Sequence, residues 1–413
     1  MPSESSSHTL TIVIPALNEE QAIGGTVSAC LAAADQVKQR SGVSAIEIIV
    51  VSDGSTDGTV EIVRGIDGVQ LIVFEENRGY GAALMEGFRQ GSGSLVGFLD
   101  ADGTCDPRLF GELARTLIAE NADVVLGSRL GPESQMPPLR RFGNHLFALL
   151  LGVLCGKSIT DTASGMRVLR REALEWLYPL PTGLHFTPSM SARALLGGLR
   201  LVEIPMPYRQ RVGQSKLRVV SDGFRFARVI LHDVLCYRPE RLFLMAFAVC
   251  LVAGMLWAAY PLEYYIAERR VEDWMIYRFL VCGLLASAGY QLLAGTALAH
   301  RMARFGPPRQ TAESFWPVLV ARLFEGWPLV AFITFCTAAS LAVLWPGLAE
   351  YAATGHVQMH WSRLVTGTFG LVVASQGVVA GILMRVLDIW QIQAVHKSSR
   401  AQRHATGGSR GKP

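Results

Sequence analysis

The sequence predicts two structural units, an α/β domain followed by a membrane domain of four helices. Up to about residue 235, short apolar runs rich in β-branched residues alternate with helical patterns, and charged residues and glycines are interspersed. Beyond that point the chain carries long stretches without charge. A chain of 413 residues also exceeds a single average domain. Together these observations favour an α/β unit joined to a bilayer unit.

Four stretches of the second half are long enough to cross the hydrocarbon core of a bilayer as helices. None of them contains a charged residue, and soluble cores rarely supply four such runs. We therefore predict membrane spans rather than the buried helices of a large soluble protein. The spans are Leu242–Tyr260, Phe279–Ala299, Pro328–Ala349 and Leu364–Met384.

The distribution of basic residues between the spans predicts their orientation. Cytoplasmic loops are enriched in lysine and arginine. The loop 300–327 carries four arginines, whereas the loop 350–363 carries only Arg363. The first residues, Met1–Thr9, are polar and lack the apolar core of a secretory signal peptide. We therefore expect an integral, multi-pass membrane protein whose α/β domain and both termini are cytoplasmic.

These features divide the chain into five segments. Between the α/β domain and the first span, apolar and basic residues are interleaved at helical spacing, which is typical of a helix that docks on a membrane surface. The segments are a polar tail at 1–9, the α/β domain at 10–217, the amphipathic juxtamembrane helix at 218–241, the four spans within 242–386 and a basic cytoplasmic tail at 387–413.

The first unit contains five predicted strands, at Leu10–Ile14, Ile46–Val51, Val69–Phe74, Leu95–Leu99 and Val124–Leu126. Alternation of strands with helices predicts a parallel sheet with right-handed crossovers, and ligands of such sheets gather at the carboxyl ends of the strands. Polar clusters follow three of these strands, at 15–20, 52–57 and 100–102. We expect the three clusters to meet at one edge.

Several sequence motifs carry a family resemblance. In this order, IPALNEE (14–20), VVSDGSTDGT (50–59), NRGYGAAL (77–84), FLDADGTCDP (98–107) and GSR (127–129) resemble a family 2 glycosyltransferase of the GT-A fold. The later segments DTASGMR (161–167) and RVGQSKL (211–217) narrow the resemblance to the dolichol-phosphate mannose synthase-like branch of polyprenyl-phosphate glycosyltransferases. It covers residues 10–235.

The resemblance implies transfer of one sugar from a UDP- or GDP-hexose to a polyprenyl phosphate, either undecaprenyl or dolichyl phosphate, with inversion at the anomeric carbon. Three alternatives stand beside it. A processive polysaccharide synthase is disfavoured because the chain has no QxxRW motif and all its spans follow the α/β domain. A transferase acting on a lipid hydroxyl would need a general base. A scaffold or lipid carrier with a degenerate nucleotide-sugar domain is disfavoured because Asp53, Asp100 and Asp102 are present.

The pair Asp100 and Asp102 is the predicted chemical centre. Both carboxylates follow an apolar strand, where hard oxygen ligands suit Mg²⁺ or Mn²⁺ held against a diphosphate leaving group. Related enzymes show a polar residue two positions later, which makes Thr104 the candidate third ligand. Arg129 is expected near the phosphates, because a guanidinium donates paired hydrogen bonds and stays charged.

The resemblance implies a nucleotide site formed by the loops after the first two predicted strands, together with Arg78 and Asp100. Asp53 is expected to accept hydrogen bonds from the base, but Ser52 stands where the family commonly has another aspartate, which leaves uracil and guanine open. The predicted nucleotide-binding residues are Pro15, Leu17, Glu19, Asp53, Arg78 and Asp100.

The acceptor phosphate needs a basic, membrane-facing pocket. A phosphate monoester has a second pKa of about 6, so it is largely a dianion near neutrality and attacks without a strong base. The apolar run Leu146–Cys155 is too short to span a bilayer and fits an interfacial or a core helix. The predicted acceptor and loop residues are Arg141, Asn144, Ser164, Arg211, Ser215 and Lys216.

Composition limits the other partners. The formal net charge is only +4, and no basic run with interleaved aromatics indicates nucleic acid. The GxxxG pattern at Gly377–Gly381 is compatible with a homo-oligomer or with close packing inside one chain.

Overall fold

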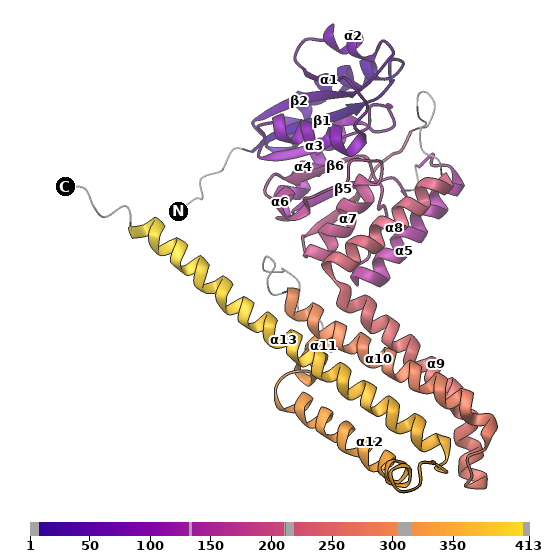
Figure 1. Cartoon of the computed structure of the whole chain (residues 1–413). Helices are drawn as coiled ribbons and strands as arrows, with labels where there is room; N and C mark the ends of the chain where they lie inside the picture. The colour runs from indigo at the N-terminus through magenta and orange to yellow at the C-terminus, as the bar shows by residue number, and fades with distance from the viewer. Residues whose placement is uncertain (1–7, 132–133, 210, 212–218, 304–314, 408–413) are drawn as a thin grey trace. The chain divides into compact units, whose positions relative to one another are not determined.

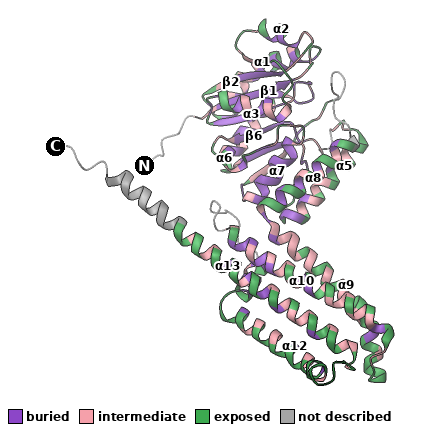
Figure 2. Ribbon diagram, viewed as in Figure 1, coloured by how far each residue is buried: buried purple, intermediate pink, exposed green. Residues whose placement is uncertain are grey.

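The computed structural model describes residues 8–131, 134–209, 211, 219–303 and 315–407. The chain forms two compact units, Met1–Tyr237 and Arg238–Pro413, and each is treated by itself. Strands occur in the first unit and long helices make up the second (Figure 1). The strands are mostly buried, whereas the long helices of the second unit are mostly half-buried or exposed (Figure 2).

The first unit is built on one seven-stranded sheet in the order β3-β2-β1-β4-β6-β5-β7. All five predicted strands are present. The strands are β1 (Thr9–Ala16), β2 (Ala45–Asp53), β3 (Gln70–Phe74), β4 (Leu95–Phe98), β5 (Val124–Ser128), β6 (Arg167–Arg170) and β7 (Leu201–Pro205).

The prediction of a wholly parallel sheet is wrong at one strand. β6 pairs antiparallel with both β4 and β5, while the other neighbours are parallel. The chain returns to β6 from the carboxyl edge of the sheet rather than through a crossover, so the strand must run the opposite way. The loop before β6 therefore lies at the carboxyl edge.

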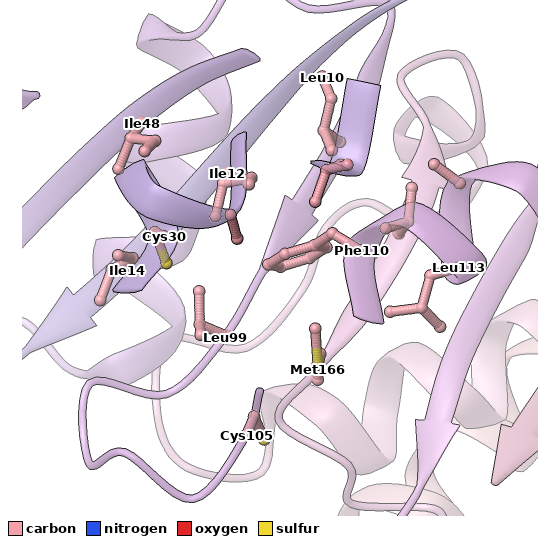
Figure 3. Packing of buried hydrophobic residues seen from close by; sticks show 14 of the residues in the cluster. Leu10, Ile12, Ile14, Cys30, Ile48, Leu99, Cys105, Phe110, Leu113 and Met166 are labelled. Carbon is pink, nitrogen blue, oxygen red and sulfur yellow. The ribbon is translucent and has the colours of Figure 1, made fainter. Parts of the chain in front are cut away.

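Side chains alternate between two cores because successive residues of a strand face opposite ways. Ile12 and Ile14 pack with Phe110 on one face, whereas Val13 packs with Phe88 on the other. Figure 3 shows the first of these clusters. The helices of this unit are α1 (Ile23–Ser41), α2 (Thr59–Arg64), α3 (Tyr80–Gln90), η1 (Pro107–Leu109), α4 (Phe110–Ala119), α5 (Pro138–Cys155), α6 (Ala173–Leu177), α7 (Phe186–Gly197) and α8 (Val219–Tyr237).

The second unit contains four helices that are long and apolar enough to cross a membrane. The four predicted spans lie within them and are confirmed as helices. They expose large apolar side chains such as Leu256 and Phe335, which are 73% and 71% exposed and suit lipid contact. The elements are α9 (Pro239–Glu268), η2 (Asp273–Met275), α10 (Ile276–Met302), α11 (Phe315–Leu323), α12 (Trp327–Thr354) and α13 (Trp361–Gly407).

Two expected boundaries differ from the structure. The single helix expected over 218–241 ends with α8 at Tyr237, and α9 starts at Pro239. Proline has no backbone N–H to continue a helix but is well suited to the first helical position. The tail expected from residue 387 begins inside α13, which continues to Gly407.

The glycines of α13 are used for packing inside the chain. A Cβ built on Gly377 would lie 2.8 Å from the Tyr290 hydroxyl and 2.9 Å from Ile333, and one on Gly381 would lie 3.1 Å from Leu329. These contacts bring α13 close to α10 and α12, as small residues do between membrane helices. The GxxxG pattern therefore has a role within one copy of the chain.

Candidate active site

The loops after β1 and β2 are joined by hydrogen bonds. Asn18 has a positive φ of 47°, and its side-chain oxygen accepts from the Thr56 amide at 2.8 Å. Asp57 accepts from the Thr59 amide and hydroxyl at 3.1 and 2.5 Å, which satisfies donors at the start of α2. The same carboxylate accepts from the Glu20 amide at 3.2 Å. Two of the three predicted polar clusters thus meet.

Asp53 fastens the loop after β3 to this edge. Its buried carboxylate accepts from the backbone amides of Arg78 at 2.7 Å and Gly79 at 3.0 Å. The close approach depends on Gly54, which has a φ of +72°, and whose added Cβ would lie 2.5 Å from the Asn77 nitrogen. The side chain expected to meet a nucleotide base therefore also shapes the loop beside that site.

Asp100 is held by a tyrosine that the sequence analysis missed. The Tyr80 hydroxyl donates to Asp100 Oδ1 at 2.8 Å. On the other side, a Cβ added to Gly165 would lie 2.1 Å from Asp100 Oδ2, so the backbone packs directly against the carboxylate. Burial and the charge of Asp102 raise the pKa of Asp100 to about 7, although the hydrogen bond from Tyr80 opposes the shift.

The two carboxylate oxygens of Asp102 contact different groups. Oδ1 accepts from the Thr104 amide at 3.1 Å and from the Thr104 hydroxyl at 2.7 Å. Oδ2 lies 3.2 Å from Nη1 of Arg211. Thr104, the candidate third metal ligand, is turned toward Asp102 in this structure and orients its carboxylate.

Arg211 links the loop after β1 to the Asp-x-Asp segment. While Nη1 faces Asp102, Nη2 donates to Glu19 Oε1 at 2.5 Å. Three predicted residues from distant parts of the sequence therefore lie together. Ser215 and Lys216, predicted for the same loop, lie outside the described residues.

Arg129, Asn144 and Ser164 belong to a buried network around the fully buried Asp161. Nε and Nη2 of Arg129 each donate to Asp161 at 2.7 Å, and Asn144 donates to it at 3.2 Å. Ser164 donates to the Gly127 carbonyl at 2.5 Å. Burial alone would raise the pKa of Asp161, but the paired guanidinium holds it below its ordinary value.

The structure also places four other predicted residues, Arg78, Arg141, Pro15 and Leu17. The exposed Arg78 guanidinium is 4.5 Å from the ring centroid of Phe74, and within the described part of the chain it makes no ion pair with Asp100 or Asp102. Arg141 reaches the Leu130 and Gly131 carbonyls at 3.4 Å each. Pro15 is buried inside β1, and Leu17 is half-buried just beyond it.

Tyr80 and Glu203 were not predicted for the carboxyl edge of the sheet, because only the folded chain brings them there. Tyr80 follows the NRG of one motif, but no spacing indicates that it reaches Asp100. Glu203 of β7 accepts from the backbone amides of Thr160 at 2.8 Å and Asp161 at 2.9 Å, and so fixes the loop before β6. Its position in a short strand gives no sign of that role.

The oxygen donors at this edge fit Mg²⁺ or Mn²⁺. Asp102 Oδ2 already lies against a cationic group, the guanidinium of Arg211. Across residues 8–407, apart from the gaps given above, no group of three His, Cys, Asp or Glu side chains is placed to hold a metal ion. A site with one or two carboxylates is normal for Mg²⁺, which completes its shell with water and substrate phosphates.

Comparison with known proteins identifies the family. The model of glycosyl transferase family 2 matches residues 11–177. The chain is 32% identical to the low-salt glycan biosynthesis hexosyltransferase Agl6 of Haloferax volcanii, over 69% of this chain and 67% of that protein. It is 35% identical to a dolichyl-phosphate hexose transferase of the same organism, over 54% of this chain and 92% of that protein.

The chain therefore belongs to glycosyl transferase family 2 and is a glycosyltransferase. Its predicted fold class, an α/β domain followed by four long apolar helices, is confirmed. Among solved structures, it resembles glucosyl-3-phosphoglycerate synthase from Mycobacterium tuberculosis in complex with Mn²⁺, UDP and phosphoglyceric acid. That match has a TM-score of 0.44 and 22% identity over 56% of this chain and 78% of the other, too distant to bear on mechanism.

Proposed function

We propose that this enzyme transfers one hexose from a UDP- or GDP-sugar to undecaprenyl or dolichyl phosphate at the cytoplasmic face of a membrane, with inversion at the anomeric carbon and dependence on Mg²⁺ or Mn²⁺. The observation that carries the proposal is the Asp100, Asp102 and Arg211 cluster at the carboxyl edge of the sheet, in a chain that also holds four apolar helices. The name of the dolichyl-phosphate hexose transferase relative supports this acceptor class.

On the donor side, we assign Asp102 and Asp100 to the metal and the diphosphate. A divalent cation there would supply positive charge against the charge that develops on the leaving group. Thr104 orients Asp102 through two hydrogen bonds. The nucleotide is assigned to the adjoining loops, through Pro15, Leu17, Glu19, Asp53 and Arg78.

The bond changes need no strong base from the protein. An oxygen of the lipid phosphate dianion forms the bond to the anomeric carbon, the bond from that carbon to the nucleotide diphosphate breaks, and its electron pair leaves with the nucleotide. The chain's own residues then act by positioning and charge. We assign the acceptor phosphate to the side of the site that contains Arg129, Arg141, Asn144 and Ser164. The loop that contains Arg211, Ser215 and Lys216 is assigned to the donor diphosphate beside it.

Two neighbouring helices of the α/β unit support docking on a lipid surface. Five apolar side chains of α5 recur every three or four residues and are 53% to 68% exposed, which forms one stripe. Phe147 of α5 and Phe226 of α8 join the helices, with ring centroids 5.8 Å apart. Helix α8 adds three exposed apolar residues. The two sets are Leu139, Phe142, Leu146, Leu149 and Val153, and Phe224, Leu231 and Leu235.

The orientation of this surface follows from charge as well as hydrophobicity. Arg225 and Arg228 are exposed on α8 and alternate along the sequence with its exposed apolar residues, as expected for a helix that lies among anionic headgroups. Together with the basic loop at 300–327, they support a topology in which the α/β unit and both termini are cytoplasmic.

A donor panel tests the proposal. The full chain, reconstituted in nanodiscs, is incubated with polyprenyl phosphate or a lipid alcohol and with radiolabelled UDP- or GDP-hexoses, in the presence of Mn²⁺ or of EDTA. We expect label in the organic phase from one nucleotide class, released by mild acid, and lost with EDTA. Transfer to alcohols alone would favour the hydroxyl-lipid alternative. Nucleotide-sugar binding without transfer to any lipid would favour the scaffold.

A further inference from the structure

Arg211 occupies the one oxygen of Asp102 that the rest of the loop leaves open to a cation. Thr104 engages Oδ1 through two hydrogen bonds, and Arg211 lies 3.2 Å from Oδ2. The arginine is anchored from the other side by Glu19 at 2.5 Å, and its side chain is only 22% exposed. Its Nε is buried and has no hydrogen-bond partner among the described residues.

The neighbouring carboxylate does not offer an easier route. One oxygen of Asp100 accepts from Tyr80, and the other lies against the backbone of Gly165. A divalent cation that approaches Asp102 in the ligand-free protein therefore meets the charge of Arg211. Two cations that compete for one carboxylate oxygen repel each other, and a guanidinium cannot relieve the repulsion by losing its proton.

We propose that Arg211 is a placeholder cation, which keeps the metal position closed between Glu19 and Asp102 until a nucleoside diphosphate binds. The diphosphate offers Arg211 alternative oxygens with paired hydrogen-bonding geometry, and it adds oxygen ligands to the carboxylates that the described residues supply. Metal binding then follows nucleotide binding rather than preceding it. This inference rests on the proposed metal role of Asp102.

The same arrangement gives Arg211 a second role after it leaves Asp102. A guanidinium that moves from a carboxylate to the diphosphate carries its charge to the leaving group. Removing Arg211 should therefore have opposite effects on two measurements, with tighter binding of the metal alone and slower transfer. A residue that only bound phosphate would weaken transfer without altering the affinity for metal alone.

Mn²⁺ binding to the full chain, followed by the EPR signal of free Mn²⁺, separates these cases. The proteins are wild type, Arg211→Gln, Arg211→Lys and Arg209→Gln, without nucleotide and with UDP or GDP. Arg209 is the matched control because it is an exposed arginine two residues away, 3.8 Å from Asp106. Thermal melting checks that each variant is folded. If Arg211→Gln does not fold, Arg211→Lys, which retains the charge, is compared with wild type in its place.

For wild type we expect weak binding of Mn²⁺ alone and about 5- to 150-fold tighter binding with the nucleotide, the usual range for coupled sites. Arg211→Gln should bind Mn²⁺ alone about tenfold more tightly and show weaker coupling. Arg211→Lys should fall between these two proteins, and Arg209→Gln should match wild type.

Two results would overturn the inference. If Arg211→Gln and wild type bound Mn²⁺ alone with equal affinity, the placeholder role would be wrong while the proposed function stood. If no protein bound Mn²⁺ even with nucleotide, both the placeholder role and the metal dependence would be wrong. Sugar transfer in EDTA would then show whether the acceptor assignment survives.

Discussion

Two carboxylates at the carboxyl edge of the sheet each pair with an arginine, but they accept different numbers of hydrogen bonds. Asp161 is fully buried and accepts five hydrogen bonds, three from Arg129 and one each from Asn144 and Ala163. Asp102 accepts two from Thr104 on Oδ1, and among the described residues its Oδ2 faces only the Arg211 guanidinium.

This difference separates a fixed framework from an exchangeable site. Every accepting direction of Asp161 is used, so the carboxylate holds α5, β5 and the loop before β6 in one arrangement. Asp102 instead depends on a side chain that a ligand can draw away. Substitutions at the first should lower stability, and substitutions at the second should lower activity.

The largest effect is expected for Asp161→Asn. The amide removes the charge that balances the mostly buried guanidinium of Arg129, and breaking such a pair costs about 3–5 kcal/mol. Denaturation of the purified chain in detergent, followed by circular dichroism, should show that loss for the α/β unit. A change as small as that of an exposed Asp→Asn variant would refute the framework role.

Asp102→Asn should reduce sugar transfer by about 10²–10³-fold, as expected when a group that stabilises developing charge is lost. The variant should melt close to wild type, because Asp102 is not the centre of the buried network. Asp35→Asn is the matched control, since Asp35 is exposed and pairs only with Lys38 among the described residues. Unchanged transfer by Asp102→Asn would contradict the donor-site assignment.

Tyr80→Phe tests whether the tyrosine hydroxyl positions Asp100. It removes one hydrogen bond to a carboxylate and should lower kcat about tenfold, because Asp100 loses the donor that orients it. The KM for the donor should change little. Tyr178→Phe is the control, since Tyr178 directly follows α6 and is 37% exposed. Equal kcat values for both variants would show that Tyr80 does not position Asp100.

The smallest effect is expected from pH. Protons compete with the metal for Asp100, whose pKa is raised to about 7, so its metal-binding, ionised form increases as pH rises through that value. Mn²⁺ affinity in the presence of nucleotide should therefore fall roughly twofold from pH 8 to pH 7 and more steeply below. The binding isotherms at each pH provide the measurement, and a flat profile between pH 6 and 8 would contradict this role of Asp100.

Much of the fold follows from local pattern. Runs such as Ile46–Val51 are β-branched and predict strands by themselves, and the uncharged runs predict the membrane helices from length alone. Strand β6 has only four residues, two of them arginines, and neither its length nor its direction could be predicted. Its direction depends on the path of the preceding loop, which is a property of the folded chain.

Part of the candidate site could also be predicted from local sequence pattern. Asp100 and Asp102 lie two residues apart after a strand, so sequence alone places them at the edge. The partners of these aspartates lie elsewhere in the sequence. Tyr80 is 20 positions from Asp100, and Arg211, which contacts Asp102, is 192 positions from its other partner, Glu19. Such pairings depend on tertiary packing. Conversely, Arg78 has the expected chemistry, but its guanidinium lies over Phe74 instead.

Transfer to a lipid phosphate can be tested with two acceptors that differ only at the reacting group. Wild-type chain in nanodiscs is given the labelled donor, Mn²⁺, and either a polyprenyl phosphate or the polyprenol of the same length. If the enzyme transfers sugar to a lipid phosphate, label enters the organic phase with the phosphate and does not exceed background with the alcohol. Equal labelling of the two lipids, or labelling of the alcohol alone, would contradict it.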